Sequence, residues 1–138
     1  MNAKDFLRQI KKLDRLIENK LIEIQQLKDT ANNTTANLTG ERVQSSGNPQ
    51  KIAHAIGRYV DLERELNQDI DKFIDAKKDV ISVIEQLNAT EYDVLHKIYV
   101  QYLTLEDVAD AYDRTYSWAT TIHGRALKHV QNILNKRG

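Results

Sequence analysis

The sequence contains no cysteine, a single proline and few aromatic residues, and each of these shortages excludes a class of protein. Without cysteine the chain has no disulfide framework, and it has no thiolate to bind zinc or to act as a nucleophile. One proline, together with 7% aromatic and 29% charged residues, favours solvated helices over a thick globular core. The composition therefore predicts an all-α protein.

Long hydrophobic runs are also missing from the sequence. No stretch approaches the roughly 20 apolar residues of a membrane-spanning helix, so membrane binding is not expected. The chain shows no nucleophile elbow, no phosphate-cradling glycine loop and no paired metal site, and its four histidines lack the spacing of metal ligands. We expect an intracellular protein that is not an enzyme and that holds neither a metal nor another cofactor.

Two long segments, residues 3–30 and 50–87, carry apolar residues at alternating steps of four and three, which is the spacing of one helix face. Polar residues interrupt both series, Lys20 in the first and Glu63 and Lys77 in the second. The second helix would be about 55 Å long, which is too long for it to be buried in one small globule. The two stripes therefore predict a long antiparallel helical hairpin of the coiled-coil type.

Residues 31–49 interrupt this pattern with two glycines, a proline and many Asn, Thr and Ser residues, and we expect a long loop there. The hairpin and its loop make the first predicted domain, residues 1–87. A coiled-coil spacer is the simplest role for it, and an arm for oligomerisation or protein docking is the alternative. The apolar faces are wide, so we also expect a homo-oligomer. Acidic residues of the second helix are assigned to its solvated face: Asp61, Glu63, Glu65, Asp69, Asp71 and Asp75.

Helical segments become short after Leu87, and residues 88–138 make the second predicted domain. Thr90, Thr104 and Thr115 stand where helix N-caps are expected. The predicted helices that follow these caps cover about 91–102, 105–111 and 116–134.

Charge is divided unequally within this second domain, although the net charge of the whole chain is zero. Residues 88–113 contain six acidic residues and one lysine, whereas residues 114–138 contain five basic residues and no acid. Because binding to DNA requires cations that neutralise phosphates, the last segment is the candidate for contact with nucleic acid.

The stretch LTLEDVADAYDRTYSWATTIHGRAL, residues 103–127, resembles the helix-turn-helix of bacterial sigma-factor region four. In that motif a short helix of the type SLEEIA precedes a turn, a Ser or Thr cap and a recognition helix that ends in I-H-x-R-A-L. The resemblance implies a DNA-binding domain whose recognition helix, about 116–134, lies in the major groove. The matching residues are Val108, Ala109, Thr115, Ile122, His123, Arg125, Ala126 and Leu127.

Nearly the whole chain, including the segments ERVQSSG and VISVIEQL, resembles a family of small phage and prophage proteins of Gram-positive bacteria that are grouped with late-gene transcriptional regulators. This resemblance implies a regulator of phage or prophage genes in the cytoplasm of the bacterial host. The chain departs from the region-four pattern at the turn Tyr112–Arg114, which has no glycine. It also has Tyr, Ser, Trp and Thr at the start of the recognition helix, where Arg and Glu are typical, and this implies weaker binding per module.

The first residues of a recognition helix reach base edges, and cations beside them reach phosphates. Trp118 is either packed against the supporting helix or exposed as a wedge, and His123 is either structural or phosphate-facing. Base reading is assigned to Tyr116, Ser117, Thr120 and Thr121, and phosphate contact to Arg114, Arg125 and Lys128.

Double-stranded DNA is therefore the expected partner, and sequence-specific transcriptional regulation is the expected function. Region-four modules also dock on RNA polymerase. The weakly basic start of the recognition helix leaves an alternative open, an adaptor or decoy that docks on RNA polymerase or another protein without binding DNA itself.

Overall fold

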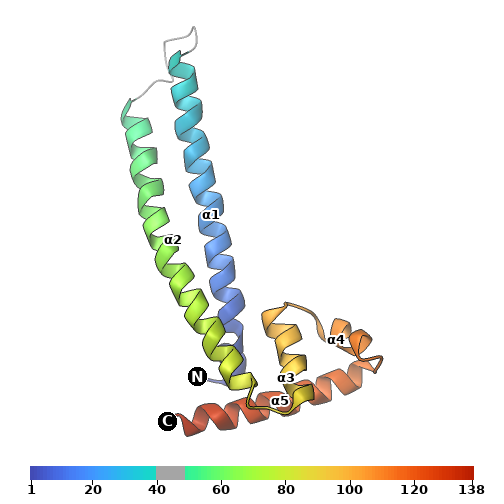
Figure 1. Ribbon diagram of the computed structural model, residues 1–138. Coiled ribbons are helices and arrows are strands. Elements are labelled where there is room, and N and C mark those ends of the chain that lie inside the picture. The colour runs from blue at the N-terminus through green and yellow to red at the C-terminus, as the bar shows by residue number, and fades with distance from the viewer. Residues whose placement is uncertain (40–48) are drawn as a thin grey trace. The chain divides into compact units, whose positions relative to one another are not determined.

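The computed structural model describes residues 1–39 and 49–138 of the chain, with side chains at residues 1–32 and 49–138. Among the residues described it contains helices and no strand, so the prediction of an all-α protein is confirmed (Figure 1). Contacts divide the chain into two compact units, the two-helix unit (residues 15–71) and the multihelix unit (residues 1–14 with 72–138). The elements are α1 (Ala3–Thr39), α2 (Pro49–Ile84), α3 (Ala89–Leu95), the π-helical segment η1 (His96–Val100), α4 (Leu105–Ala111) and α5 (Tyr116–Lys136).

The loop predicted at residues 31–49 is wrong for residues 31–39, because α1 continues as a helix to Thr39. Asn and Thr each cost a helix only about 0.7 kcal/mol or less relative to alanine, so a helix that is already formed extends through them. Ala31 in this stretch is buried, which adds packing energy to the helix. The remainder of the predicted loop, residues 40–48, lies outside the described residues.

Helix α2 begins at Pro49, one residue before the predicted start, and ends at Ile84, before the predicted Leu87. Proline suits the first helical position because the N–H that it lacks would have no partner there. At the other end, the Leu87 amide donates to the Ile84 carbonyl at 3.0 Å, which closes the last turn.

Apolar packing in the two-helix unit is confined to a narrow strip. Ile24 of α1 is buried together with Leu62 and Leu66 of α2, and partly buried neighbours extend this cluster along both helices. Several large apolar residues of the unit stay exposed, because two helices cover only one face of each other: Leu16, Leu21, Ile22, Ile56 and Val60.

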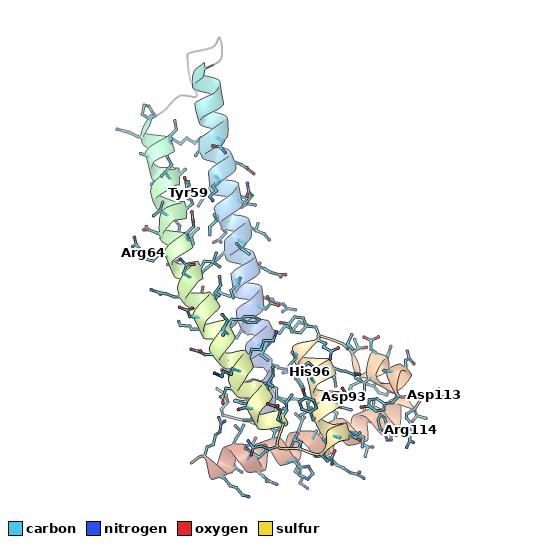
Figure 2. All side chains as sticks on the ribbon, viewed as in Figure 1. Tyr59, Arg64, Asp93, His96, Asp113 and Arg114 are labelled. Carbon is cyan, nitrogen blue, oxygen red and sulfur yellow. The ribbon has the colours of Figure 1, made fainter. Side chains whose placement is uncertain are left out.

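The assignment of Asp69 to a solvated face is wrong, since this side chain is buried and forms an ion pair with Lys20. The polar residue that interrupts the first apolar stripe therefore has its counter-ion on α2. Figure 2 shows Tyr59 on the side of α2 that faces α1 and Arg64 on the opposite side. The Lys28 ammonium lies 5.5 Å from the centre of the Tyr59 ring, so a cation also covers the edge of the apolar strip.

The multihelix unit has a continuous apolar core. Its members come from the beginning of α1, the end of α2, α3, η1 and α5, and several of them have no exposed surface at all. Residues from several helices thus bury one another, whereas only two helices contribute to the apolar strip of the two-helix unit. The core consists of Ala3, Phe6, Leu7, Ile10, Val80, Val83, Ile84, Leu95, Tyr99, Ala126 and Val130.

Helix α3 is capped by Asn88, whose side chain accepts a hydrogen bond from the Glu91 amide at 2.9 Å, so the predicted cap at Thr90 is wrong. Asn and Asp side chains cap a helix at least as well as threonine, and Asn88 is the residue with extended backbone angles. The predicted single helix to residue 102 is also wrong. The chain passes through the π-helical segment η1 and then bends at Tyr102, which has a φ of 64°.

Helix α4 begins as predicted, with Thr104 as its cap. The Asp107 amide donates to the Thr104 hydroxyl at 3.1 Å, and the Asp107 carboxylate accepts from the Thr104 amide at 2.9 Å, so the two residues form a capping box. The hydrogen bond from the Thr104 amide, followed by the interaction with the Thr104 side chain, lowers the pKa of Asp107. Val108 and Ala109 then pack on Val94 and Ala119, in a second apolar cluster that joins α3, α4 and α5.

Candidate nucleic-acid interface

The start of α5 is set by a cap that the sequence predicted. Thr115 has extended backbone angles, and its hydroxyl accepts a hydrogen bond from the Trp118 amide at 3.0 Å. This bond satisfies one of the free amides in the first turn and ends the connection from α4 at a defined residue. The first turn of α5 is therefore locally stabilised where the base-reading residues are predicted.

The connection between α4 and α5 makes its turn without glycine. Asp113 adopts a φ of 52°, a left-handed conformation that Asp tolerates better than most residues. The Arg114 amide then donates to the Ala109 carbonyl at 2.9 Å. Figure 2 shows Asp113 and Arg114 at the bend that leads into α5.

Trp118 is packed rather than presented as a free wedge. Its ring is half-buried and lies 5.0 Å from the Tyr112 ring, centre to centre. The Arg114 guanidinium lies over the Trp118 ring, 5.1 Å from its centre. Trp118 also packs against the apolar cluster that contains Val94 of α3, the supporting helix, so of the two alternatives that the sequence left open the packed one holds. The stacking also restrains Arg114, one of the predicted phosphate contacts, because a guanidinium over an indole loses freedom.

A polar contact holds the connection to α3. The Tyr112 hydroxyl donates a hydrogen bond to the Asp93 carboxylate, which also accepts from the Lys97 ammonium at 3.2 Å. The bond from Tyr112 lowers the pKa of Asp93. Burial, the hydrogen bond and the nearby carboxylate charge raise the pKa of Tyr112 to about 12. Both pKa shifts widen the pH range in which Asp93 is ionised and Tyr112 is neutral, and this is their state at neutral pH.

One face of α5 is buried and the other is polar and exposed. Ala119, Ala126 and Val130 have no exposed surface. Among the predicted base-reading residues, Tyr116 is 55% exposed, Ser117 and Thr121 are exposed, and Thr120 is half-buried. The predicted residues thus lie on the first two turns of α5, away from the face that packs.

The two threonines of this face direct their protons into the helix. The Thr120 and Thr121 hydroxyls donate to the Ser117 carbonyl at 2.8 and 2.9 Å. A hydroxyl that uses its proton in this way is left with its acceptor lone pairs. In this state both side chains can accept from an amino group of adenine or cytosine, and each still has a methyl group for apolar contact with thymine.

The predicted phosphate contacts are all exposed. Arg114 lies on the connection, whereas Arg125 and Lys128 follow on the third and fourth turns of α5. Lys128 also lines a cleft together with Lys4 and Arg8 of α1. No contribution from α1 was predicted, although basic residues at positions 4, 8 and 11 have the four-and-three spacing of one helix face.

His123 is a half-buried neighbour of this face. Its Nε2 lies 2.8 Å from the Tyr99 hydroxyl, and the two rings stack with their centres 5.7 Å apart. Burial, assisted by the charges of Lys4 and Arg8, lowers the pKa of His123. The ring is therefore held neutral by its surroundings near neutral pH.

No group of three or more His, Cys, Asp or Glu side chains in the described part of the chain could hold a metal ion. None of the described helices is both long and apolar enough to cross a membrane. Comparison with protein-family models, with curated proteins and with solved structures finds no match for this chain.

Proposed function

We propose that this protein is a sequence-specific DNA-binding transcriptional regulator of phage or prophage genes. In this proposal α4 and α5 form a helix-turn-helix of the sigma region-four type, and α5 enters the major groove. The sequence resemblance of residues 103–127 to that motif supports it. The resemblance of most of the chain to phage late-gene regulators supports the choice of genes.

One observation carries this proposal: α5 divides into a buried apolar face and an exposed face on which hydrogen-bonding side chains precede cations. The uncharged residues Ser117, Thr120 and Thr121 occupy its first two turns, and Arg125 and Lys128 follow. A recognition helix needs this order, because its first turns meet the bases while flanking cations meet the phosphates. Ser117, Thr121, Arg125 and Lys128 are exposed, and Thr120 is half-buried.

We further propose that the two long helices form an antiparallel hairpin that serves as an arm for self-association. The ion pairs Lys20–Asp69 and Lys28–Glu63 support this direction of pairing, since the later residue on α1 meets the earlier residue on α2. Exposed apolar residues of the two-helix unit, such as Leu21 and Ile22, offer a surface for a second copy. Sedimentation is expected to show a dimer or larger species at tens of micromolar, and a monomer at that concentration contradicts the proposal.

Mutations on α5 separate base reading from phosphate contact. Starting from a duplex recovered by the protein from a random pool, Thr120→Ala should cost about 1 to 3 kcal/mol on that site and little on a scrambled duplex. Arg125→Ala should weaken both duplexes alike and reduce the salt slope of binding by about 1. Fluorescence anisotropy at several salt concentrations measures both effects.

The control for this experiment is Asn132→Ala, an exposed residue further along α5 that has no assigned role. It should bind both duplexes as the parent protein does. Duplex binding that survives Tyr116→Ala, Thr120→Ala and Arg125→Ala combined, at moderate salt, would contradict the placement of α5 in the groove.

A second function, an adaptor that docks on RNA polymerase, is favoured by a separate observation. Residues 88–113 carry a surplus of acid, and Glu106 and Asp110 of α4 are exposed next to the proposed reading helix. Such acids repel phosphates but suit a basic protein surface. Capture of purified RNA polymerase by the combined α5 variant, in the absence of duplex binding by the parent protein, would favour this function.

A further inference from the structure

Two clefts in the multihelix unit share the side chains of Lys4 and Arg8. The larger has a volume of about 600 Å³ and continues to Lys128 and Gln131 on α5. The smaller has a volume of about 310 Å³ and is bordered by Lys11 on α1 and by His123 on α5. The shared residues join the clefts into one surface that includes the beginning of α1 and the adjoining part of α5.

Four basic residues lie along these clefts, and we call them the cationic track: Lys4, Arg8, Lys11 and Lys128. All four are exposed. Within the described part of the chain, none of the four forms an ion pair with a carboxylate, whereas Lys97 in the same unit pairs with Asp93 at 3.2 Å. The charge of the track is therefore available to an external anion.

The groups beside the cationic track are consistent with a surplus of positive charge on it. The charges of Lys4 and Arg8 add to burial in lowering the pKa of His123. Two acids border the track: Asp5 lines the larger cleft, and Asp14 accepts a hydrogen bond from the Tyr102 hydroxyl at 2.7 Å. The Lys11 ammonium lies 5.7 Å from the centre of the Tyr102 ring. Four cations thus outnumber the two carboxylates.

We propose that the cationic track binds the sugar-phosphate backbone of duplex DNA beside the groove that α5 enters. This inference rests on the proposed function and extends it to residues of the first helix. From Lys4 to Lys11 the helix rises about 10 Å. Over that length one strand of a duplex presents about three phosphates, which matches the three cations that α1 contributes to the track.

The track explains how a chain with no net charge binds a polyanion. The start of α5 offers few charges for phosphate contact, and the acids of residues 88–113 oppose them. Cations brought from the other end of the sequence compensate for this deficit, because folding places the beginning of α1 against α5. Phosphate contacts from two helices also fix the orientation of α5 in the groove better than contacts from one helix.

The test compares two variants of the full chain that each lose three positive charges. The track variant is Lys4→Gln with Arg8→Gln and Lys11→Gln. The control variant combines the substitutions Lys72→Gln, Lys78→Gln and Lys136→Gln, at exposed cations of the same unit that border neither cleft. Circular dichroism melting verifies that both variants fold.

The track variant should bind both the selected and the scrambled duplex roughly tenfold or more weakly near physiological salt, with the salt slope reduced by about 3. Its preference for the selected duplex should be unchanged, and the control variant should lose much less. An unchanged salt slope in the track variant, while the parent binds and Thr120→Ala still alters preference, overturns the track alone. Failure of the parent protein to bind any duplex overturns the track and the proposed function together.

A second measurement follows the His123 ring by NMR. In the free track variant the pKa of His123 should rise toward its ordinary value, because two repelling cations are gone. In the parent protein it should rise when duplex is added, because phosphates offset the same cations. A parent protein that binds duplex without any change in the pKa of His123 contradicts phosphate contact in the track.

Discussion

The two compact units of this chain bury apolar side chains to different depths. The two-helix unit has a strip around Ile24, Leu62 and Leu66 and leaves Leu21 and Ile22 more than half exposed, at 51% and 55%. In the multihelix unit, side chains from α1, α2, α3 and α5 surround one another, and many reach complete burial. Two helices cover one face each, whereas a third and fourth element close a core on all sides.

The difference also shows in how polar groups are used. The strip of the two-helix unit contains an ion pair, Lys20–Asp69, in a position where an apolar pair would pack. In the multihelix unit the buried acid is Glu91, whose Oε1 lies 2.8 Å from Nδ1 of His129 on α5, at the margin of the apolar core. The two-helix unit therefore depends on polar pairing inside its contact strip, while the multihelix unit depends on apolar packing.

The largest expected effect contrasts two leucines. Leu95 of α3 has no exposed surface, and Leu95→Ala should cost about 2 to 5 kcal/mol because it removes apolar contact and leaves a cavity. Leu21→Ala, on the exposed face of the two-helix unit, should change stability by only about 0.5 kcal/mol. Urea unfolding followed by circular dichroism measures both. Equal losses of stability in the two variants would contradict the difference in burial between the two units and indicate that Leu21 is buried against a second copy.

A middle effect is expected at the ion pair of the two-helix unit. Lys20→Met leaves the buried Asp69 carboxylate without its counter-ion and should cost about 2 to 4 kcal/mol, somewhat less than for a fully dry pair because Lys20 is partly exposed. Lys20→Met combined with Asp69→Leu should recover most of this loss, since an apolar pair of similar size fits the strip. Thermal melts of the parent and both variants measure the effect. A double variant as unstable as the single one would show that the ion pair stabilises the protein by more than the cost of burying its two charges.

The smallest expected effect concerns the hydrogen bond that joins the α4–α5 connection to α3. Tyr112→Phe should cost about 1 kcal/mol at neutral pH. The pKa of Asp93 is lowered from its ordinary 3.8, so this stabilisation is lost as the pH falls below that value. The pKa of Tyr112 is raised from 10.0 to about 12, so the stabilisation is also lost as the pH rises through that range. The difference between parent and variant, from urea midpoints, should be constant from about pH 5 to 9 and shrink at both ends. A difference that persists at acid pH would contradict the role of the ionised Asp93.

Local interactions explain which predictions from the sequence were confirmed. The caps Thr104 and Thr115 involve residues three positions away, so the sequence contains all that they require. The same local reasoning failed at residues 31–39 and at Thr90. At the first position, composition suggested a loop where the helix continues, and at the second, the neighbouring Asn88 was the better placed cap.

Burial and charge pairing depend on residues far apart in the chain. Asp69 follows Leu62 and Leu66 at the four-and-three spacing of one helix face, which its exposed acidic neighbours do not share, but its partner Lys20 lies on another helix and the spacing does not reveal the ion pair. Trp118 was equally ambiguous, because the apolar cluster against which it packs includes Val94 of α3, far from it in the sequence.

The sequence by itself determined the helical class of this protein, the capped starts of α4 and α5, and the alternation of apolar and polar faces on α5, because periodicity and capping are short-range properties. Tertiary structure alone decided which cations are paired and which are free. It brought Lys4 and Arg8 beside Lys128, from opposite ends of the chain, and it buried Asp69 against Lys20. The physical reason is that electrostatic energy depends on distance in space, and only the packing of helices converts a separation along the chain into such a distance.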